Sequence, residues 1–361
     1  MSSRHPDVPV FSGQGTDFVN AARTHAQGRY YPRFLWNSIS NLRSIWTNNP
    51  YDIHTGIDLL APSPQAVNNP ILSSARLFLL QVLWYLAHVE TLSSLQIRFH
   101  NALVLLDTST KSLGVLGSSS GVLAACVTAA SMSLPAYISY SVQAFRLAFW
   151  VGFRLQEYRH NVLVNMDSTA IQLPWSVAVF GLDQHALENH IADFGTRVQR
   201  LSSNYHRRYC PELLTVCALR STTLSTLYHS ATHLASARQQ TLEDASLRNI
   251  CFPELSDLTT PIRSTYAGEL ISNTTPGSLV KLVVDMLLMH PVNWDLAVAS
   301  LKRDAGNSAF CPANYSPGLG LMRITEKALE GTASIAVDIT LEFESKSNER
   351  NAKHEPNHDR R

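Results

Sequence analysis

This chain lacks several features that commonly mark a protein's function. Its 361 residues include 29 lysines and arginines against 28 aspartates and glutamates, which leaves a net charge of only +1. Because the charges are so evenly balanced, the sequence predicts no basic surface for nucleic acid or for an anionic membrane. The five cysteines are odd in number, widely separated and never spaced as C-x-x-C, so neither a disulfide framework nor a zinc site is predicted. We therefore expect no nucleic-acid partner, no membrane partner and no bound metal.

Long uninterrupted hydrophobic runs are also missing. The most apolar segment, 71–87, contains Arg76 and Gln81, which predicts a buried helix rather than a membrane span. The first residues, MSSRHPDVPVF, contain no hydrophobic signal region, and together with the cysteine usage this predicts a cytoplasmic protein. Hydrophobic residues make up 45% of the chain and charged residues 16%, as expected of a globular protein. Only residues 344–361, which contain no Phe, Trp, Tyr, Val, Ile or Thr, are predicted to form a disordered tail.

The clearest motif in the chain is GSSSG at 117–121. It fits the G-x-S-x-G pattern, in which a strand turns sharply into a helix and exposes the central hydroxyl. The apolar run 113–116 before it suits a strand, and the small apolar residues of 122–130 suit a closely packed helix. Gly117 would permit the turn, and Gly121 would let the helix approach the strand. The pattern predicts Ser119 as a nucleophile, although an ordinary Ser/Gly loop would have the same letters.

Elsewhere the chain alternates between predicted strands and helices, which is typical of an α/β core. The expected strands are 8–11, 113–116, 175–182, 261–265, 309–311 and 333–339. The expected helices are a largely helical stretch over 17–107, then 136–159, 183–194, 229–247, 279–289 and 319–329. A strand followed directly by a helix at 175–194, after two long helices, predicts a separate small α+β subdomain there.

Four segments, taken together, resemble the starter-unit acyltransferase domain of fungal, basidiomycete-type non-reducing polyketide synthases. They are FSGQGT at 11–16, GVLGSSSG at 114–121, LYHS at 227–230 and HPVNWD at 290–295. The likeness covers residues 8 to 343. It implies an α/β acyltransferase fold with an α/β-hydrolase-like core, formed by 1–167 and 227–343. Inserted in that core would be a small ferredoxin-like α+β subdomain at 168–226, shortened relative to the family.

The resemblance also implies a chemistry: transfer of an acyl starter from coenzyme A to the phosphopantetheine arm of an acyl carrier protein, with no bound cofactor. Ser119 would carry the acyl group and His229 would be its general base, because a serine hydroxyl needs a neighbouring base and imidazole titrates near neutral pH. In the family a backbone carbonyl orients the histidine, here near Leu287. The backbone N–H groups of Gln14 and Ser120 would bind the oxyanion. The implied partners are acyl-CoA, the carrier protein and the rest of a polyketide synthase.

Two departures from related proteins bear on this chemistry. Extender-unit acyltransferases hold the malonyl carboxylate with an arginine, and the corresponding position here is Val151. An apolar residue there predicts an uncharged acyl group, such as acetyl or a short fatty acyl chain. Many relatives carry cysteine in place of Ser119; since an alcohol is less acidic than a thiol, the dependence on His229 should be greater in this chain.

Other interpretations remain open at this point. A serine hydrolase could use Ser119, Asp257 and His290 in the chain order Ser, Asp, His. A catalytically inert member of the family could only dock a carrier protein, given the shortened subdomain. His229 and His233 lie four residues apart on one helix face and could bind zinc, but HSATH lacks the glutamate of H-E-x-x-H. A metal site is therefore not predicted.

Overall fold

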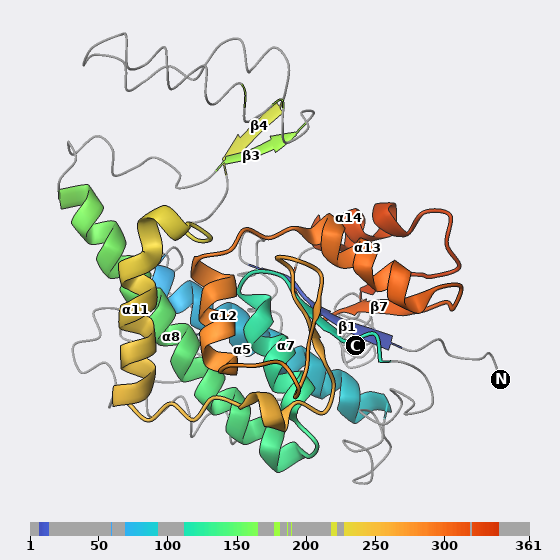
Figure 1. Cartoon of the computed structure of the whole chain (residues 1–361), viewed down its shortest axis with the longest axis horizontal. Coiled ribbons are helices and arrows are strands. Elements are labelled where there is room, and N and C mark those ends of the chain that lie inside the picture. The colour runs from blue at the N-terminus through green and yellow to red at the C-terminus, as the bar shows by residue number, and fades with distance from the viewer. Residues whose placement is uncertain are drawn as a thin grey trace, which may run out of the picture.

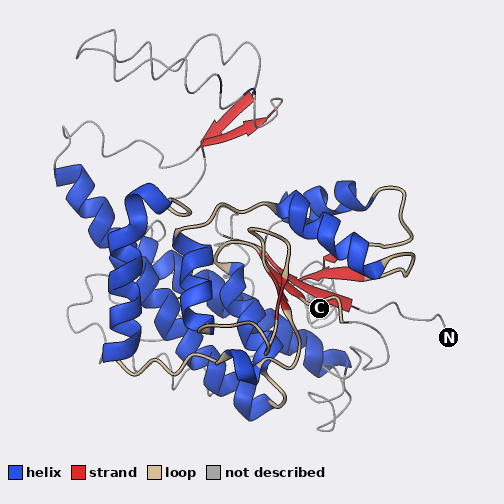
Figure 2. Cartoon of the chain, viewed as in Figure 1, coloured by secondary structure: helices blue, strands red, loops and turns tan. Residues whose placement is uncertain are grey.

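The computed structural model describes residues 7–13, 59, 69–92, 112–164, 177–180, 186, 189, 218–221, 227–317 and 320–338. Its centre is a six-stranded sheet with helices on both sides (Figures 1 and 2). The strands are β1 (Asp7–Phe11), β2 (Val115–Gly117), β5 (Ile262–Arg263), β6 (Leu270–Ile271), β7 (Cys311–Asn314) and β8 (Val337–Asp338). The helices are α5 (Pro70–Leu92), α7 (Gly121–Ala130), α8 (Leu134–Val164), α11 (Ala231–Leu247), α12 (Leu279–Leu288), α13 (Trp294–Ala305) and α14 (Gly320–Leu329), with a 3-10 helix at Leu255–Asp257.

The strand order in the sheet is β6-β5-β2-β1-β7-β8, and every pair is parallel except β5 and β6. In a parallel sheet of this kind, ligands bind at the carboxyl ends of the strands. β1 and β2 lie side by side at the centre, with Phe11 opposite Gly117 in the register. The segments that follow these two strands carry Gly13 and Ser119. Both segments therefore leave the sheet at the carboxyl ends of its strands.

Each face of the sheet packs against a different group of helices, because successive side chains of a strand point to opposite faces. Val8, Val10 and Leu116 lie in one apolar cluster with Trp294 and Leu301 of α13. The neighbouring strand residues Phe11 and Val115 point to the other face. There they belong to a larger core that includes residues of α5, α7, α8, α11 and α12. The predicted α/β class is confirmed.

Helix α5 is long and apolar enough to cross a membrane if judged by length and composition alone, but 89% of that stretch is buried inside the fold. Arg76, in its middle, is completely buried and donates from Nε to the carbonyl of Leu59 at 2.6 Å. Burial lowers the Arg76 pKa to about 10. The helix predicted at 71–87 is thus a core helix of the α/β layers, as expected from its interrupting polar residues.

Most of the other predicted elements are present near their expected bounds, but the domain division stays a prediction. Much of the proposed small subdomain, 168–226, falls outside the described residues; those described include strands β3 (Val177–Phe180) and β4 (Ala218–Ser221), which pair antiparallel. The predicted disordered tail, 344–361, and most of the predicted helical stretch 17–107 also lie outside them. Among the described elements, the sequence did not predict helix α13, the 3-10 helix at Leu255–Asp257, or strands β4 and β6.

The two glycines of the GSSSG motif are required by close packing. A Cβ on Gly121 would lie 2.2 Å from the carbonyl oxygen of Phe11, and one on Gly117 would lie 2.5 Å from the Cα of Val122. Gly121 therefore lets the first turn of α7 lie against the end of β1, as predicted. Gly117 does not have a positive φ, so it serves close approach rather than the strained turn; the positive φ of the turn falls on Ser119 instead.

We expect Gly121→Ala to destabilise the protein by about 3 kcal/mol or more, because the new methyl group meets backbone atoms that cannot rotate away. Chemical denaturation, followed by circular dichroism, measures this change. Gly320 provides the matched control, since it also begins a helix and a Cβ there would meet nothing within 4 Å. Gly320→Ala should change the free energy of unfolding by roughly 0.5 kcal/mol or less. Equal stabilities of the two variants would contradict the packing argument.

Candidate active site

Ser119 lies on a tight turn between a strand and a helix. β2 ends at Gly117 and α7 begins at Gly121, and Ser119 between them has φ +52°. Residues other than glycine rarely adopt this left-handed backbone conformation, and where one does so the surrounding structure must hold it. The holding bonds run from the Ser118 N–H to the carbonyl of Phe11 at 2.7 Å and from the Gly121 N–H to the carbonyl of Ser118 at 2.9 Å. Ser119 is partly exposed although both of its neighbours are buried, as the motif predicted.

The loop after β1 packs directly on Ser119. A Cβ on Gly13 would lie 2.5 Å from the Ser119 Cβ and 3.2 Å from its Oγ. A buried polar network holds this loop: Gln81 of α5 donates to the carbonyl of Ser12 at 2.6 Å, and the Ser12 N–H donates to the hydroxyl of Ser316 at 2.7 Å. Gln81 also donates to the Ser316 hydroxyl, at 2.9 Å. The sequence indicated Gln81 only as a break in an apolar helix; its role as an anchor needs the three-dimensional neighbours.

His229 approaches Ser119 from the segment that precedes α11. Its φ is +56°, so the second candidate residue also has a left-handed backbone. The end of α12 fixes this backbone, because the carbonyls of Leu287 and Leu288 accept from the N–H groups of His229, at 3.4 Å, and Ser230, at 2.7 Å. An ion pair between Arg238 of α11 and Asp285 of α12 further joins the two helices.

The two side chains meet. The Ser119 Oγ lies 2.7 Å from the His229 Nε2, across 110 positions of sequence. The other ring nitrogen, Nδ1, lies 2.8 Å from the carbonyl oxygen of His290. A carbonyl only accepts hydrogen bonds, so in the neutral ring the proton is on Nδ1 and Nε2 is free to accept the Ser119 hydroxyl proton. The prediction that the Leu287 carbonyl orients the ring is therefore wrong, because the carbonyl that contacts the ring is that of His290. Leu287 lies at the end of α12, and its carbonyl accepts from the backbone N–H of His229 instead.

Burial lowers the pKa of His229 from its ordinary value of 6.5, since removal from water disfavours the charged ring. Hydrogen bonds to the carbonyls of His290 and Met286 act in the opposite direction but are weaker. At neutral pH the ring is consequently unprotonated, which is the state that a general base requires.

Of the two backbone donors predicted for the oxyanion, Ser120 lies within the described residues. Ser120 is buried and is the N-cap of α7, so its N–H lies at the end of a helix where such groups lack intrahelical acceptors. This end of a helix also favours negative charge. Gln14 lies outside the described residues, although Gly13 immediately before it contacts Ser119.

The alternative triad is not assembled around Ser119. Asp257 accepts from the backbone N–H of Glu254 at 2.9 Å and completes the cap of the 3-10 helix. The ring of His290 stacks on Tyr266, at 4.4 Å between centroids. Only the backbone carbonyl of His290 takes part in the dyad, a contribution that the sequence could not separate from that of its side chain. Among the residues that the structure describes, no three His, Cys, Asp or Glu side chains are grouped to hold a metal, and His233 is exposed.

Comparison with known proteins identifies a family and a fold that this chain matches. A family model described as "Starter unit:ACP transacylase in aflatoxin biosynthesis" matches residues 33–243. The orsellinic acid synthase ArmB of Armillaria ostoyae is 36% identical over 375 residues, covering 93% of this chain and 17% of that protein. An orsellinic acid synthase of Beauveria bassiana is 25% identical over 289 residues, covering 73% of this chain and 12% of that protein. The chain thus spans less than a fifth of the length of these relatives.

Solved structures with the same fold include malonyl-CoA:acyl carrier protein transacylases. The enzyme of Helicobacter pylori superposes with a TM-score of 0.61 at 12% identity, covering 98% of this chain and all of that one. That of Clostridium perfringens gives a TM-score of 0.60 at 15% identity, covering 97% of this chain and 99% of that one. At such low identity the likeness concerns the fold, and it confirms the predicted acyltransferase architecture.

Proposed function

The chain belongs to the starter unit:ACP transacylase family and is an acyltransferase, and from this premise we propose that it loads an acyl starter from coenzyme A onto an acyl carrier protein. The acceptor is the thiol of the carrier's phosphopantetheine arm. The observation that carries the proposal is the 2.7 Å contact of the Ser119 Oγ with the His229 Nε2, at a turn that exposes the serine.

In the proposed first half-reaction, the Ser119 Oγ attacks the thioester carbonyl while the His229 Nε2 takes the hydroxyl proton. The carbon–sulfur bond then breaks, and the imidazolium returns the proton to the departing coenzyme A thiolate, leaving an ester on Ser119. In the second half-reaction His229 takes the proton of the carrier thiol, the sulfur attacks the ester, and the proton goes back to the Ser119 oxygen. The hydrogen bond that the Nδ1–H of His229 donates to the His290 carbonyl holds the ring in the tautomer that both steps need.

Each half-reaction passes through a tetrahedral intermediate with a negative oxygen. We propose that the N–H of Ser120 at the N-terminus of α7 and the N–H of Gln14 in the loop after β1 stabilise it. Donors that are already in place when the charge develops are worth about 3 kcal/mol each in related chemistry. The packing of Gly13 on Ser119 and the anchoring of Ser12 by Gln81 support this arrangement.

We propose further that the starter is uncharged. Val151 is 1% exposed and belongs to the apolar core. The two arginines near it on α8 are both occupied: Arg154 pairs with Asp244 at 2.6 Å, and Arg146 donates to the carbonyl of Arg248 at 2.7 Å. A malonyl carboxylate would need a charged partner when removed from water, and these contacts favour an acetyl or short fatty acyl group instead.

The proposed biological setting is polyketide synthesis. The relatives reported above are named orsellinic acid synthases and are much longer than this chain, so the carrier protein and the rest of a synthase are proposed partners. The cytoplasmic location, the absence of a bound cofactor and the absence of nucleic-acid or membrane partners stay predictions.

Intact-mass measurement tests the proposal. The protein is mixed with acetyl-, hexanoyl- or malonyl-CoA, and then with carrier protein that either bears or lacks the phosphopantetheine arm. We expect an acetyl or hexanoyl adduct that persists in buffer and moves only to the carrier that bears the arm. Malonyl-CoA should load at least roughly tenfold more slowly, the discrimination typical of one missing specific contact.

The two alternative functions, hydrolase and inert docking module, would give different results in this experiment. A hydrolase would release free acid without carrier protein, and an inert docking module would give no adduct with any acyl-CoA. Malonyl loading as fast as acetyl loading would overturn only the proposed substrate class. The assembled dyad favours the transferase over the inert module, because nothing in docking requires a neutral imidazole against a serine hydroxyl.

A further inference from the structure

The aromatic ring of Tyr266 lies face to face with the ring of His290. Their centroids are 4.4 Å apart and their planes differ by 14°. Tyr266 is 45% exposed, and His290 is partly buried. Stacked aromatic contacts of this kind stabilise the two rings beyond the effect of the area they bury. The stack therefore restrains His290, the residue whose carbonyl accepts the Nδ1–H of His229.

His290 needs such a restraint because it has left the helix. α12 ends at Leu288, and the His290 N–H still donates to the carbonyl of Asp285 at 3.0 Å. Its carbonyl, however, points to a side chain rather than into a backbone ladder. Pro291, which follows, limits the conformations open to His290 but does not fix the direction of that carbonyl. The ring contact with Tyr266 provides a second point of attachment.

The turn that carries Tyr266 is itself firmly held. The Ser264 hydroxyl accepts from the N–H groups of Tyr266 and Ala267, both at 3.3 Å, and the Gly268 N–H donates to the Ser264 carbonyl at 3.0 Å. The Asn293 N–H donates to the carbonyl of Thr265 at 2.6 Å, which ties the turn to the segment after His290.

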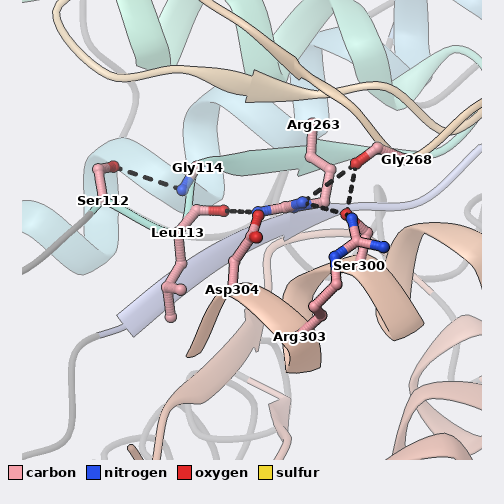
Figure 3. A network of polar contacts seen from close by, with 8 residues as sticks. All are labelled: Ser112, Leu113, Gly114, Arg263, Gly268, Ser300, Arg303 and Asp304. Atoms are coloured by element: carbon pink, nitrogen blue, oxygen red, sulfur yellow. Dashed lines mark hydrogen bonds and ion pairs between the residues drawn. The ribbon is translucent and has the colours of Figure 1, made fainter. Parts of the chain in front are cut away.

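Buried polar contacts anchor this turn to the sheet (Figure 3). Arg263 of β5 is completely buried and donates to the carbonyl of Gly268 at 3.1 Å and to the hydroxyl of Ser300 at 2.7 Å. It also donates to the carbonyl of Leu113, just before β2, at 3.0 Å and pairs with Asp304 of α13 at 2.9 Å. One guanidinium thus connects the Tyr266 turn, the start of the strand that leads to Ser119, and α13.

We propose that Tyr266 is a positioning residue for the acyl transfer: its ring holds His290 so that the His290 carbonyl keeps His229 aimed at Ser119. The inference rests on the proposed function, because it assigns a role in that reaction. The path runs from a rigid turn through two stacked rings to a backbone carbonyl and then to the imidazole. Tyr266 acts only through His290 in this scheme.

Steady-state transfer of acetyl from coenzyme A to the carrier protein provides the first test. Tyr266→Ala should lower kcat roughly tenfold with little change in KM, the size expected when a reacting group is slightly misplaced. Tyr266→Phe keeps the ring and should behave as wild type. The double variant Tyr266→Ala/His290→Ala should be no slower than His290→Ala alone, since the second change removes a contact already lost. Leu296→Ala, another exposed apolar truncation that packs on the same Gly268 turn, is the matched control and should leave kcat unchanged.

Three results would overturn the inference: full activity of Tyr266→Ala, equal loss in Tyr266→Phe, or an effect confined to KM, which would indicate substrate contact. A second readout does not depend on turnover. In nuclear magnetic resonance spectra the hydrogen-bonded His229 Nδ1 proton, assigned by its loss in His229→Asn, should weaken or disappear in Tyr266→Ala and remain in Tyr266→Phe. If the wild type loads no acyl group, the proposed function fails, and this signal alone decides whether Tyr266 holds the histidine.

Discussion

Ser119→Ala is expected to give no acyl adduct with any acyl-CoA, and to lower transfer to the carrier protein by about 10³-fold or more, the usual consequence of removing a nucleophile. The reason is that the Ser119 Oγ is the atom that lies against the His229 Nε2, at 2.7 Å, on a turn that exposes it. Neither neighbouring serine can replace it, because both Ser118 and Ser120 are buried. Intact mass after incubation with acetyl-CoA measures the adduct directly.

Two further variants serve as controls for this result. Ser118→Ala removes a hydroxyl one residue away while leaving the backbone bond from Ser118 to Phe11 in place, so it should load normally. Ser119→Cys should form a thioester adduct, because a thiol at the same position faces the same base. An adduct that survives in Ser119→Ala would remove Ser119 from its role and would require another nucleophile.

The sequence was sufficient to predict the central parts of this site because they depend on local rules. A strand, three small residues and a small-residue helix define the turn at Ser119 whatever surrounds it. The buried strands, the long helices α5 and α8, and the shorter helix α12 also follow from hydrophobic pattern alone. Pairing of Ser119 with His229, by contrast, came from the family resemblance, since no rule of spacing relates residues 110 positions apart.

The parts that the sequence did not predict depend on contacts between distant segments. Whether Leu287 or His290 presents its carbonyl to the histidine ring depends on where α12 ends, and helix ends are poorly defined by sequence. Helix α13 had usable signals: Asn293 caps it, Lys302 and Arg303 lie in its last turn, and Trp294, Val298 and Leu301 follow helical spacing on its buried face. Of these residues, only Asn293 and Trp294 belong to the HPVNWD motif, and the helical spacing continues beyond it to Leu301.

His229→Asn should lower the rate of acyl transfer by about 10²- to 10⁴-fold, the usual contribution of a general base. Asparagine is chosen because it tolerates a left-handed backbone, and His229 has φ +56°, so the loss reflects the missing base and not a distorted chain. The pH profile provides the sharper measurement. Burial lowers the His229 pKa below 6.5. The wild-type rate should therefore not change with pH around pH 7, and it should fall only below pH 6.5, where the ring takes up a proton.

The acid limb of that profile should be absent in His229→Asn, whose residual rate depends on no imidazole. The same lowered pKa has a consequence for folding: the unfolded chain binds the proton more readily than the folded one, so stability due to the neutral ring is present above pH 6.5 and is lost as the pH falls through the lower folded-state pKa. Wild type should therefore lose more stability than His229→Asn between pH 7 and pH 5. A midpoint of the acid limb above 6.5 would mean that the imidazolium is stabilised at the site, which is incompatible with a buried base waiting unprotonated beside Ser119.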